Sequence, residues 1–557
     1  MKAYFQDKEN RITAAVFLIT MLIACSPLIT RYCINGHDAE YHLLRIESLK
    51  EGILMGKPFL KINVLFFGGA GYASSLFYPD FLLYFPALLR VCGVGINASY
   101  HLLIALCFCL SYGAAFYCTK RMTGSRYAGM AAGILLTLCQ YHMDDVYIRS
   151  AAGEYTAFIF LPFVIYGIYN VLYEEMDRPW VLGIGFGGVL LCHTSTFVMC
   201  LVLGIAAFLL KWRIFMKKPQ LIGRVALTAV FTAAVTSFYW LPVMEQLFSA
   251  QFYVSIPWMK PADEAVRFAE VLYPVFPSLG FLIPLLWLPR LFLKKDAEKN
   301  MLLGFADCLA AAGVLFAFLA TDLVPWERIG SYLSFIQFPW RFFVMSSVLF
   351  SFADAIILFC CTKKELSGIS MEKPALLAVL FIMSAGALSG LSKNTEGYYD
   401  YADNYYTYQP YTANVIAGEW LPQTVTDADA LVTDSGRLVS DTKEELPFER
   451  VKNTVTVLIE KDYAYVDVPF IYYKGYSAYL VKEDGTKNEL PVTGEGNNGF
   501  CRVYLGDQMR GSLTVVYDGT FTQGLAAGIF TAAILMSAGL IVIKKRTLFG
   551  RHKKEAE

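Results

Sequence analysis

Long apolar runs, separated by short polar segments, extend over most of the chain. A helix that crosses a bilayer needs roughly twenty mainly apolar residues. Runs of this kind lie near residues 12–32, 97–119, 127–142, 155–173, 180–195, 196–210, 223–243, 277–293, 300–320, 340–362, 374–391 and 522–543. The pattern predicts a polytopic, all-α membrane bundle of about twelve spans.

The stretch "YPDFLLYFPALLRVCGV" from Tyr78 decides on which side of the membrane the later loops lie. If it does not span, most Lys and Arg residues between the spans fall on the cytoplasmic side, as the positive-inside rule expects. Its short length and its prolines Pro79 and Pro86 favour this interpretation. We therefore expect both termini in the cytoplasm and the segments 33–96, 143–154, 244–276 and 321–339 outside.

The segment from about Lys393 to Thr520 has a different period. It alternates like a sheet in "RVKNTVTVLIEK", "AYVDVPFIYY" and "GSLTVVYDG", with a hairpin signal at Asp484-Gly485. We expect a small extracytoplasmic β-sandwich. The chain then divides into a membrane domain at 1–392 with an outer loop at 33–96, a β-rich domain at 393–521, and a last span with a basic cytoplasmic tail at 522–557.

The composition is typical of a membrane protein and argues against nucleic-acid binding and against a cysteine metal site. The chain is 56% hydrophobic and 17% charged, and its 47 basic and 47 acidic residues give no net charge that would favour nucleic acid. Most of the 13 cysteines lie inside apolar runs without metal-ligand spacing. They are typical of small buried hydrophobic residues.

The first outer loop carries an unusual density of charge in "GHDAEYHLLRIESLKEGI", starting at Gly36. Apolar residues at helical spacing predict an amphipathic helix at the outer interface. Polar residues crowd the start of that helix: His37, Asp38, Glu40, Tyr41 and His42. Asp38 has two open interpretations, a helix N-cap or a general base or metal-positioning carboxylate assisted by Glu40.

This run, followed by "FFGGAGYASSLFYPDFLLYFPALL", resembles the first outer loop of bacterial multispanning proteins of the 6-pyruvoyl-tetrahydropterin synthase-related, or YfhO-like, family. That family resembles the wider GT-C glycosyltransferase class. Further similar motifs are "YIRSAAGEYTAFIFLPF", "LLCHTST", "FYWLPVME", "IQFPWRF" and "GEWLP". The resemblance covers nearly the whole membrane part.

The resemblance implies a transferase that takes a sugar from a polyprenyl-phosphate donor at the outer face of a bacterial plasma membrane. Its acceptor would be a cell-envelope glycan, lipid or protein. In that class the carboxylate of the first outer loop is the usual catalytic candidate, which here is Asp38. The adjacent acidic pair of the class is missing, so a divalent cation (Mg or Mn) would have only Asp38 and Glu40 as ligands.

The residues themselves fit this chemistry. A hydroxyl acceptor must lose a proton, and a phosphate leaving group needs positive charge nearby. Arg149 and Arg341 lie at predicted outer ends of spans, although a salt bridge for Arg149 with Asp144, Asp145 or Glu154, and a snorkelling role for Arg341, explain them equally well. The candidate substrate-binding residues are His37, Tyr41, His42, Arg45, Arg149, Glu154, His193 and Arg341.

Two motifs have ordinary structural interpretations as well. His193 in "CHTST" is either a cavity-lining polar group or a histidine in a capped turn. The tyrosine-rich "GYYDYADNYYTYQPY" from Gly397 is either an interfacial aromatic belt or a sugar-stacking platform.

Two other function classes stay open. A transporter or flippase of lipid-linked glycans would need charged residues within spans, of which Asp307 and Asp354 are the main examples, and repeated halves, which are not evident. A non-catalytic membrane protein with a glycan-binding outer domain is the third hypothesis.

Overall fold

The computed structural model describes residues 7–256, 260–293, 300–362, 371–394, 397–401, 418–506 and 508–556. Two compact units are present. Unit 1 comprises Met1–Leu60, Pro79–Arg224 and Ile256–Gln409, and unit 2 comprises Lys61–Tyr78, Val225–Ser255 and Pro410–Glu557.

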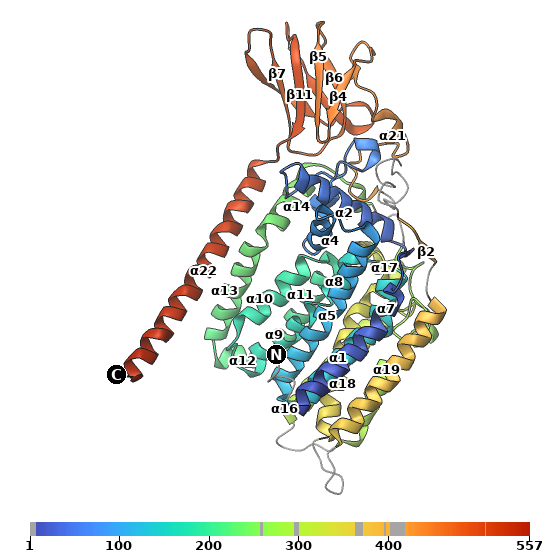
Figure 1. Cartoon of the computed structure of the whole chain (residues 1–557), viewed down its shortest axis with the longest axis vertical. Helices are drawn as coiled ribbons and strands as arrows, with labels where there is room; N and C mark the ends of the chain where they lie inside the picture. Colours follow the sequence, from blue (N-terminus) through green and yellow to red (C-terminus); the bar gives the residue numbers. More distant parts are fainter. Residues whose placement is uncertain are drawn as a thin grey trace. The chain divides into compact units, whose positions relative to one another are not determined.

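Unit 1 is a bundle of helices. Its longer helices are α1 (Lys8–Ala24), α2 (Ala39–Leu54), α5 (Ile96–Thr123), α6 (Arg126–Leu138), α9 (Leu161–Tyr173), α10 (Pro179–Leu190), α11 (Thr194–Leu210), α16 (Asn300–Leu319), α18 (Phe343–Thr362) and α19 (Glu372–Asn394). Within it α1, α5, α18 and α19 run side by side (Figure 1).

Shorter elements connect these helices. They are η2 (Ser26–Leu28), α4 (Tyr84–Val91), α7 (Gln140–Tyr147), α8 (Ala152–Ala157), α12 (Trp212–Lys217), η5 (Phe268–Glu270), α15 (Leu282–Leu286), η6 (Leu288–Phe292), α17 (Trp326–Ile329), η7 (Gly330–Ile336) and η8 (Pro339–Phe342). The strands β1 (Cys33–Ile34) and β2 (Tyr398–Tyr399) pair antiparallel.

The junction between α5 and α6 shows how local sequence sets the helix ends. Lys120 and Arg121 lie in the last turn of α5, where positive charge favours the helix dipole, and Gly124 ends the helix at φ 73°. Ser125 then starts α6, because its hydroxyl accepts a hydrogen bond from the Ala128 amide at 3.3 Å.

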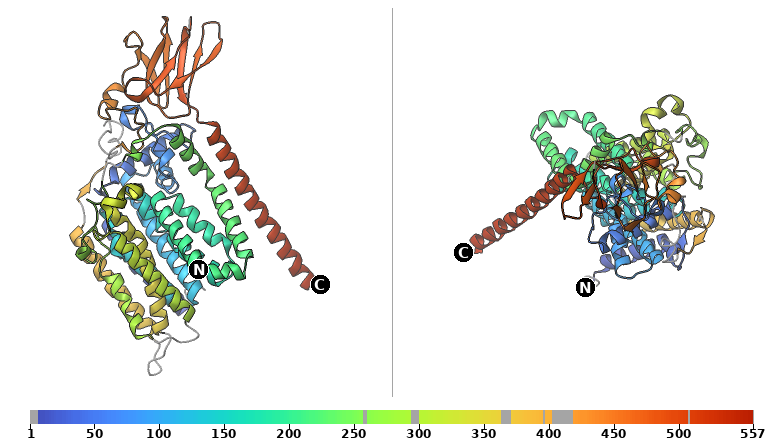
Figure 2. Two further views of the ribbon diagram at one scale, coloured as in Figure 1. Left: turned by 180° about the vertical axis from the view of Figure 1, so that it is seen from behind. Right: turned by 90° about the horizontal axis from the view of Figure 1, so that it is seen from above.

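Unit 2 contains the predicted β region. A four-stranded sheet has the order β3-β6-β10-β9, and a five-stranded sheet has the order β4-β5-β11-β7-β8. Figure 2 shows these strands, coloured orange, gathered in one body. Their bounds are β3 (Val439–Ser440), β4 (Phe448–Val451), β5 (Thr454–Ile459), β6 (Tyr465–Ile471), β7 (Tyr476–Val481), β8 (Lys487–Leu490), β9 (Val492–Thr493), β10 (Phe500–Tyr504) and β11 (Gly511–Tyr517).

The alternation expected from the sequence is present in these strands. In β11, Leu513 and Val515 are buried while Ser512 and Thr514 are partly exposed. β7 and β8 form the expected hairpin, with Gly485 at φ 84° and the Asp484 carboxylate accepting the Thr486 amide at 2.8 Å.

The other elements of unit 2 are mostly helical. They are η3 (Phe67–Gly69), α3 (Ser74–Phe77), α13 (Gln220–Val235), which begins at the end of unit 1, α14 (Ser237–Ser249), η4 (Tyr253–Ser255), α21 (Ala430–Asp434), η10 (Asn497–Gly499) and α22 (Phe521–Ala556). α14 packs against α22, with the Ser237 hydroxyl donating to the Ala526 carbonyl at 2.9 Å.

The apolar helices indicate a membrane protein, and the number of spans stays a prediction. Among the described residues six helices are long and apolar enough to cross a bilayer: Ile96–Thr123, Ala152–Tyr173, Met301–Leu319, Pro339–Thr362, Glu372–Ser392 and Phe521–Gly539. The expected span at 223–243 coincides with a pair of helices, α13 and α14, that is bent by 75°. Several other expected spans coincide with shorter apolar helices, Arg126–Leu138, Pro179–Leu190, Thr194–Leu210 and Leu282–Phe292.

The helix expected in the first outer loop is α2, but its surroundings differ from those of a surface helix. Leu43, Ile46 and Leu49 are buried as expected, and so are the polar Arg45 and Glu47. These two are neutralised by residues of the same loop, since Arg45 pairs with Asp80 at 2.5 Å and Glu47 pairs with Arg90. Within unit 1, α2 is therefore enclosed on its polar side too.

Close contact between α9 and α10 depends on glycine. A Cβ atom on Gly185 would lie 2.6 Å from the main-chain nitrogen of Val164, whereas a Cβ on Gly113 of α5 would have no atom within 4 Å. We expect Gly185→Ala to destabilise the protein by about 1–3 kcal/mol through overpacking. Gly113→Ala should be neutral or slightly stabilising.

Thermal unfolding of the purified variants in detergent measures this difference. Equal melting temperatures for Gly185→Ala and the wild type would contradict the predicted clash.

Candidate functional site

Two main-chain hydrogen bonds join the start of α2 to the segment that follows α7. The His37 amide donates to the Ile148 carbonyl at 3.0 Å, and the Asp38 amide donates to the Arg149 carbonyl at 2.7 Å. Gly36 makes this approach possible, because a Cβ there would lie 2.2 Å from the Ser150 hydroxyl oxygen. Asp38 and Arg149 are thus brought together although they are far apart in sequence.

Arg149 lies at the centre of a buried charge cluster. Its Nη1 atom lies 2.5 Å from Asp145 Oδ1 and 2.9 Å from Glu154 Oε2. The guanidinium also lies over the ring of Trp340, with its carbon 4.4 Å from the ring centroid. The salt-bridge interpretation of Arg149 is therefore correct, with Asp145 and Glu154 as its partners.

Glu154 links this pair to the second arginine. The Tyr141 hydroxyl donates to Glu154 Oε1 at 2.6 Å, and Arg341 Nε lies 3.4 Å from Glu154 Oε2. Arg341 Nη1 also donates to Gln337 Oε1 at 2.5 Å. Glu154 thus holds both arginines in place, one from the segment after α7 and one from η8.

The Asp38 side chain has no structural capping role. Asp38 occupies the N-cap position of α2, yet its carboxylate makes no capping hydrogen bond. The residue keeps part of its surface accessible, unlike Asp145 and Glu154, which are buried. Burial raises the pKa of Asp38, and the guanidinium groups of Arg149 and Arg341 offset part of this effect.

The cluster has more acids than bases. Among the described residues, Asp38, Asp145 and Glu154 each interact electrostatically with two guanidinium groups, those of Arg149 and Arg341. Burial, followed by the negative charge of Glu154, raises the pKa of Asp145 well above its usual range, although Arg149 opposes this. Asp145 therefore binds a proton more tightly than an isolated carboxyl group would.

Two predicted histidines border the cluster. His193 precedes α11, and its Nδ1 atom lies 2.8 Å from the Thr196 hydroxyl. The ring is buried and near enough to Glu154 and Arg341 to interact with them electrostatically. His37 is exposed and its ring contacts Phe276 at a centroid distance of 6.0 Å.

The remaining predicted residues lie along α2. Arg45 donates to the Pro79 carbonyl at 2.9 Å in addition to its pair with Asp80, so its charge is used within the loop. The Nη1 atom of Arg45 lies 3.2 Å from Nδ1 of His42, and the Tyr41 ring lies beside both side chains. Glu40 is partly exposed in the first turn. The tyrosine-rich segment from Gly397 lies mostly outside the described residues.

Sequence reasoning assigned Asp145 only the role of a counter-ion and did not select Tyr141. Both lie on the face of α7 that meets Arg149 and Glu154, and the available signal was their spacing of four residues in "YHMDD".

The expected divalent cation finds no set of ligands in the described part of the chain. No three His, Cys, Asp or Glu side chains come together there at metal-binding distances.

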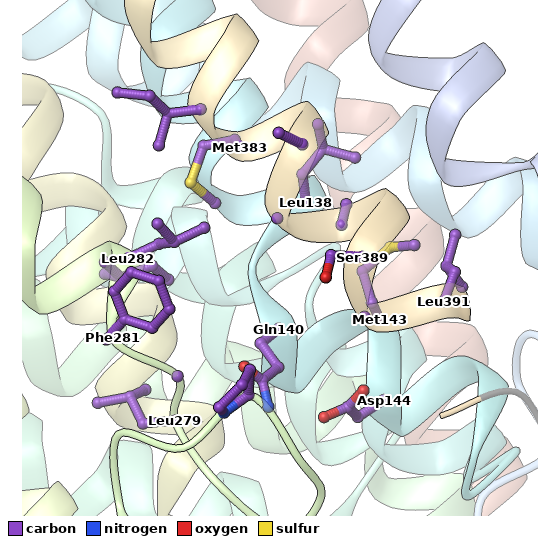
Figure 3. A pocket seen from close by; sticks show the side chains of 18 of the residues that line it. Leu138, Gln140, Met143, Asp144, Leu279, Phe281, Leu282, Met383, Ser389 and Leu391 are labelled. Atoms are coloured by element: carbon purple, nitrogen blue, oxygen red, sulfur yellow. The ribbon is translucent and has the colours of Figure 1, made fainter. Parts of the chain in front are cut away.

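A cavity of about 480 Å³ lies on another face of α7 (Figure 3). Gln140, Met143 and Asp144 line it from α7, and Met383 and Ser389 line it from α19. Asp144 thus faces this cavity, while the neighbouring Asp145 faces Arg149. The two adjacent carboxylates, Asp144 and Asp145, therefore lie in different surroundings.

The known proteins to which the chain is similar share 14–21% of their residues with it over the matched parts. No family model matches the chain. An uncharacterized protein of Lactococcus lactis subsp. cremoris (strain MG1363) is 21% identical over 337 residues, which are 56% of this chain and 54% of that protein. The chain thus spans about half the length of this curated relative.

Among solved structures, the Archaeoglobus fulgidus oligosaccharyltransferase is similar in two forms. The apo form matches with 14% identity and a TM-score of 0.35 over 70% of this chain and 57% of that one. The complex with Zn and sulfate matches with 14% identity and a TM-score of 0.36 over 69% and 54%. A likeness this distant assigns no residue of the site.

Removing the central arginine should be costly. Arg149→Met leaves the carboxylates of Asp145 and Glu154 buried without their shared cation, and breaking a buried pair in this way typically costs about 3–5 kcal/mol. Arg341→Met should cost less, because Glu154 keeps its contact with Arg149. Thermal unfolding in detergent should rank wild type, Arg341→Met and Arg149→Met in order of falling stability, and the reverse order of the two variants would disprove the central role of Arg149.

Proposed function

We propose that this protein is a membrane glycosyltransferase that transfers a sugar from a polyprenyl-phosphate-linked donor to a cell-surface acceptor. The observation that carries the proposal is the position of Asp38, a partly accessible residue whose carboxylate is near enough to the guanidinium groups of Arg149 and Arg341 to interact with them electrostatically. A carboxylate can accept a proton and guanidinium groups can stabilise a phosphate.

The proposed reaction uses these groups in one displacement. The acceptor hydroxyl oxygen forms a bond to the anomeric carbon, and the bond from that carbon to the phosphate oxygen breaks. The bonding electron pair leaves with the phosphate, whose charge the arginines stabilise. The hydroxyl proton passes to the Asp38 carboxylate.

The two arginines have different access to a substrate. The Arg341 side chain keeps 12% of its surface exposed against 4% for Arg149, which is held by two carboxylates and by Trp340. We therefore assign donor phosphate binding to Arg341 first, and the positioning of Glu154 and Asp145 to Arg149.

A lipid-linked donor explains why this charge belongs at a membrane border. The prenyl chain stays in the bilayer, and the phosphate and sugar emerge at headgroup depth. Arg341 lies at the start of the candidate span Pro339–Thr362, so a lipid phosphate can reach it without leaving the membrane. The motifs similar to YfhO-like, GT-C-like proteins support the same assignment.

The proposal places the cluster outside the cell, with both termini in the cytoplasm of a bacterium. Thr486, in the β7–β8 turn, and Arg121, in the last turn of α5, are exposed positions that test it. In a background without native cysteines, Thr486→Cys should react with a membrane-impermeant maleimide in intact cells. Arg121→Cys should react only after lysis, and its labelling in intact cells would reverse the orientation.

Loss of the Asp38 charge should affect the chemical step and spare the fold. Asparagine can occupy an N-cap position as well as aspartate does. Loss of a general base typically lowers the rate by about 10²- to 10⁴-fold. We expect purified Asp38→Asn to bind polyprenyl-phosphate sugars from a defined panel and to transfer almost none, whereas Glu40→Gln should keep most of the transfer activity.

The pH dependence gives a second readout of the same experiment. Because the ionised form of Asp38 is the base, wild-type transfer should be lost as the pH falls through the raised pKa of this carboxyl group. An ordinary aspartate has a pKa of about 3.9. The loss of transfer activity on the acid side of the pH profile should therefore occur at a higher pH than this. Near wild-type transfer by Asp38→Asn would rule out this carboxylate as the base, and binding without transfer by the wild type would favour a transporter or a glycan-binding protein.

A further inference from the structure

Two carboxylates lie well inside candidate membrane spans, away from the cluster. Asp307 lies in Met301–Leu319 and Asp354 in Pro339–Thr362. Asp307 is neutralised by Arg290, whose Nε and Nη2 atoms each lie 2.7 Å from one of its oxygens. This bidentate pair explains how one intramembrane carboxylate is tolerated.

Asp354 has no comparable partner. Its side chain is completely buried, and neither carboxylate oxygen has a hydrogen-bond partner among the described residues. An ionised carboxylate in such surroundings is strongly unfavourable unless it is paired, so the group is expected to take up a proton and become neutral.

The helices around Asp354 contain further buried polar groups of the same kind. α5, α6 and α18 pack against one another. Within the described residues four buried hydroxyl groups on these helices lack a hydrogen-bond partner, those of Ser111, Tyr112, Thr119 and Thr137, and a fifth, that of Ser347, is near only the Cys139 thiol. We call these five hydroxyls and the Asp354 carboxyl the polar seam.

The hydroxyls of the polar seam differ in their hydrogen bonding from other Ser and Thr hydroxyls of the same helices. Ser351 of α18 donates to the Ser347 carbonyl at 2.7 Å, and Thr123 of α5 donates to the Thr119 carbonyl at 2.8 Å. Such bonds to the preceding turn normally satisfy Ser and Thr within a helix. The hydroxyls of the polar seam make no such bond to the preceding turn. Burying them in the bundle therefore lowers the stability of the folded protein.

Other titratable groups do not compensate Asp354. None of those on the elements packed against α18 is a hydrogen-bond or ion-pair partner of Asp354 among the described residues. They are Tyr100, His101, Cys107, Cys109, Tyr112, Tyr117, Cys118, Lys120 and Arg121 of α5, Arg126 and Tyr127 of α6, Tyr141, His142, Asp144, Asp145 and Tyr147 of α7, Tyr166, Tyr169 and Tyr173 of α9, Cys200 of α11, Arg290 of η6, Asp307 and Cys308 of α16, Arg341 of η8, and Glu372 and Lys373 of α19.

We propose that Asp354 is a proton-binding site within the membrane, on the helix α18 that packs against α5 and α6. The carboxyl group holds a proton on one oxygen in the folded protein and releases it to water when the chain unfolds. This site is separate from the Arg149 cluster, and the proposal does not rest on the proposed glycosyl transfer.

A lipid-soluble carbodiimide provides the first test. Dicyclohexylcarbodiimide adds to a protonated carboxyl group: the carboxyl oxygen bonds to the carbodiimide carbon, the proton moves to nitrogen, and an acyl shift gives a stable N-acylurea. At pH 7 an ordinary aspartate, with a pKa of about 3.9, is almost fully ionised. We expect mass spectrometry to find the adduct on Asp354 at this pH, none on the paired Asp307, and none at position 354 in Asp354→Asn.

Stability against pH provides a test that needs no reagent to reach the site. Above about pH 4 the unfolded chain releases the Asp354 proton and the folded protein keeps it, so folding binds a proton. Wild-type stability relative to Asp354→Asn should therefore fall as the pH rises. The ratio of their unfolding equilibrium constants should change by up to about tenfold per pH unit.

Asparagine is the matched control because it is neutral, nearly isosteric and able to hydrogen-bond. A ratio that stays constant between pH 4 and pH 8 overturns the proposal, whether or not the carbodiimide reacts. Adduct formation on Asp354 together with a ratio that changes with pH establishes the proton site.

Discussion

The buried guanidinium of Arg149 is the constraint on which the candidate site depends. A cation enclosed by protein must be neutralised, and Asp145 and Glu154 do so from the helices on either side of it. This requirement fixes the turn between α7 and α8. The carbonyl of the same residue then accepts the Asp38 amide, so one residue places both the charge cluster and the start of α2.

Period-two alternation and runs of apolar residues predicted the strands and helices in which each face has the same surroundings along its length. Period-two alternation located β5, β6 and β11, and the Asp484-Gly485 turn marked the β7–β8 hairpin. Hydropathy located the apolar helices and gave their lengths poorly, because runs at 180–195 and 196–210 correspond to helices shorter than a full span. The 75° bend between α13 and α14 has no signature in hydropathy, since both arms are apolar.

The sequence predicted the residue types of the candidate site better than their contacts. Asp38, Arg149, Glu154, His193 and Arg341 were selected as charged or polar groups in predicted outer loops or at predicted span ends, and the structure brings the other four close to Glu154. Arg45 was selected on the same grounds and is instead neutralised by Asp80. Nothing in the spacing of Arg45 and Asp80 shows that the loop folds back to join them.

The three acids of the cluster differ in what holds them, and this difference favours Asp38 as the reactive group. Glu154 accepts a hydrogen bond from Tyr141 and pairs with both arginines, and Asp145 pairs with Arg149, so proton transfer to either would disturb the contacts that keep the arginines in place. Asp38 is positioned by its main-chain amide, and its side chain has no capping bond to lose. A carboxylate anchored through its backbone can change protonation state while the cluster around it stays intact.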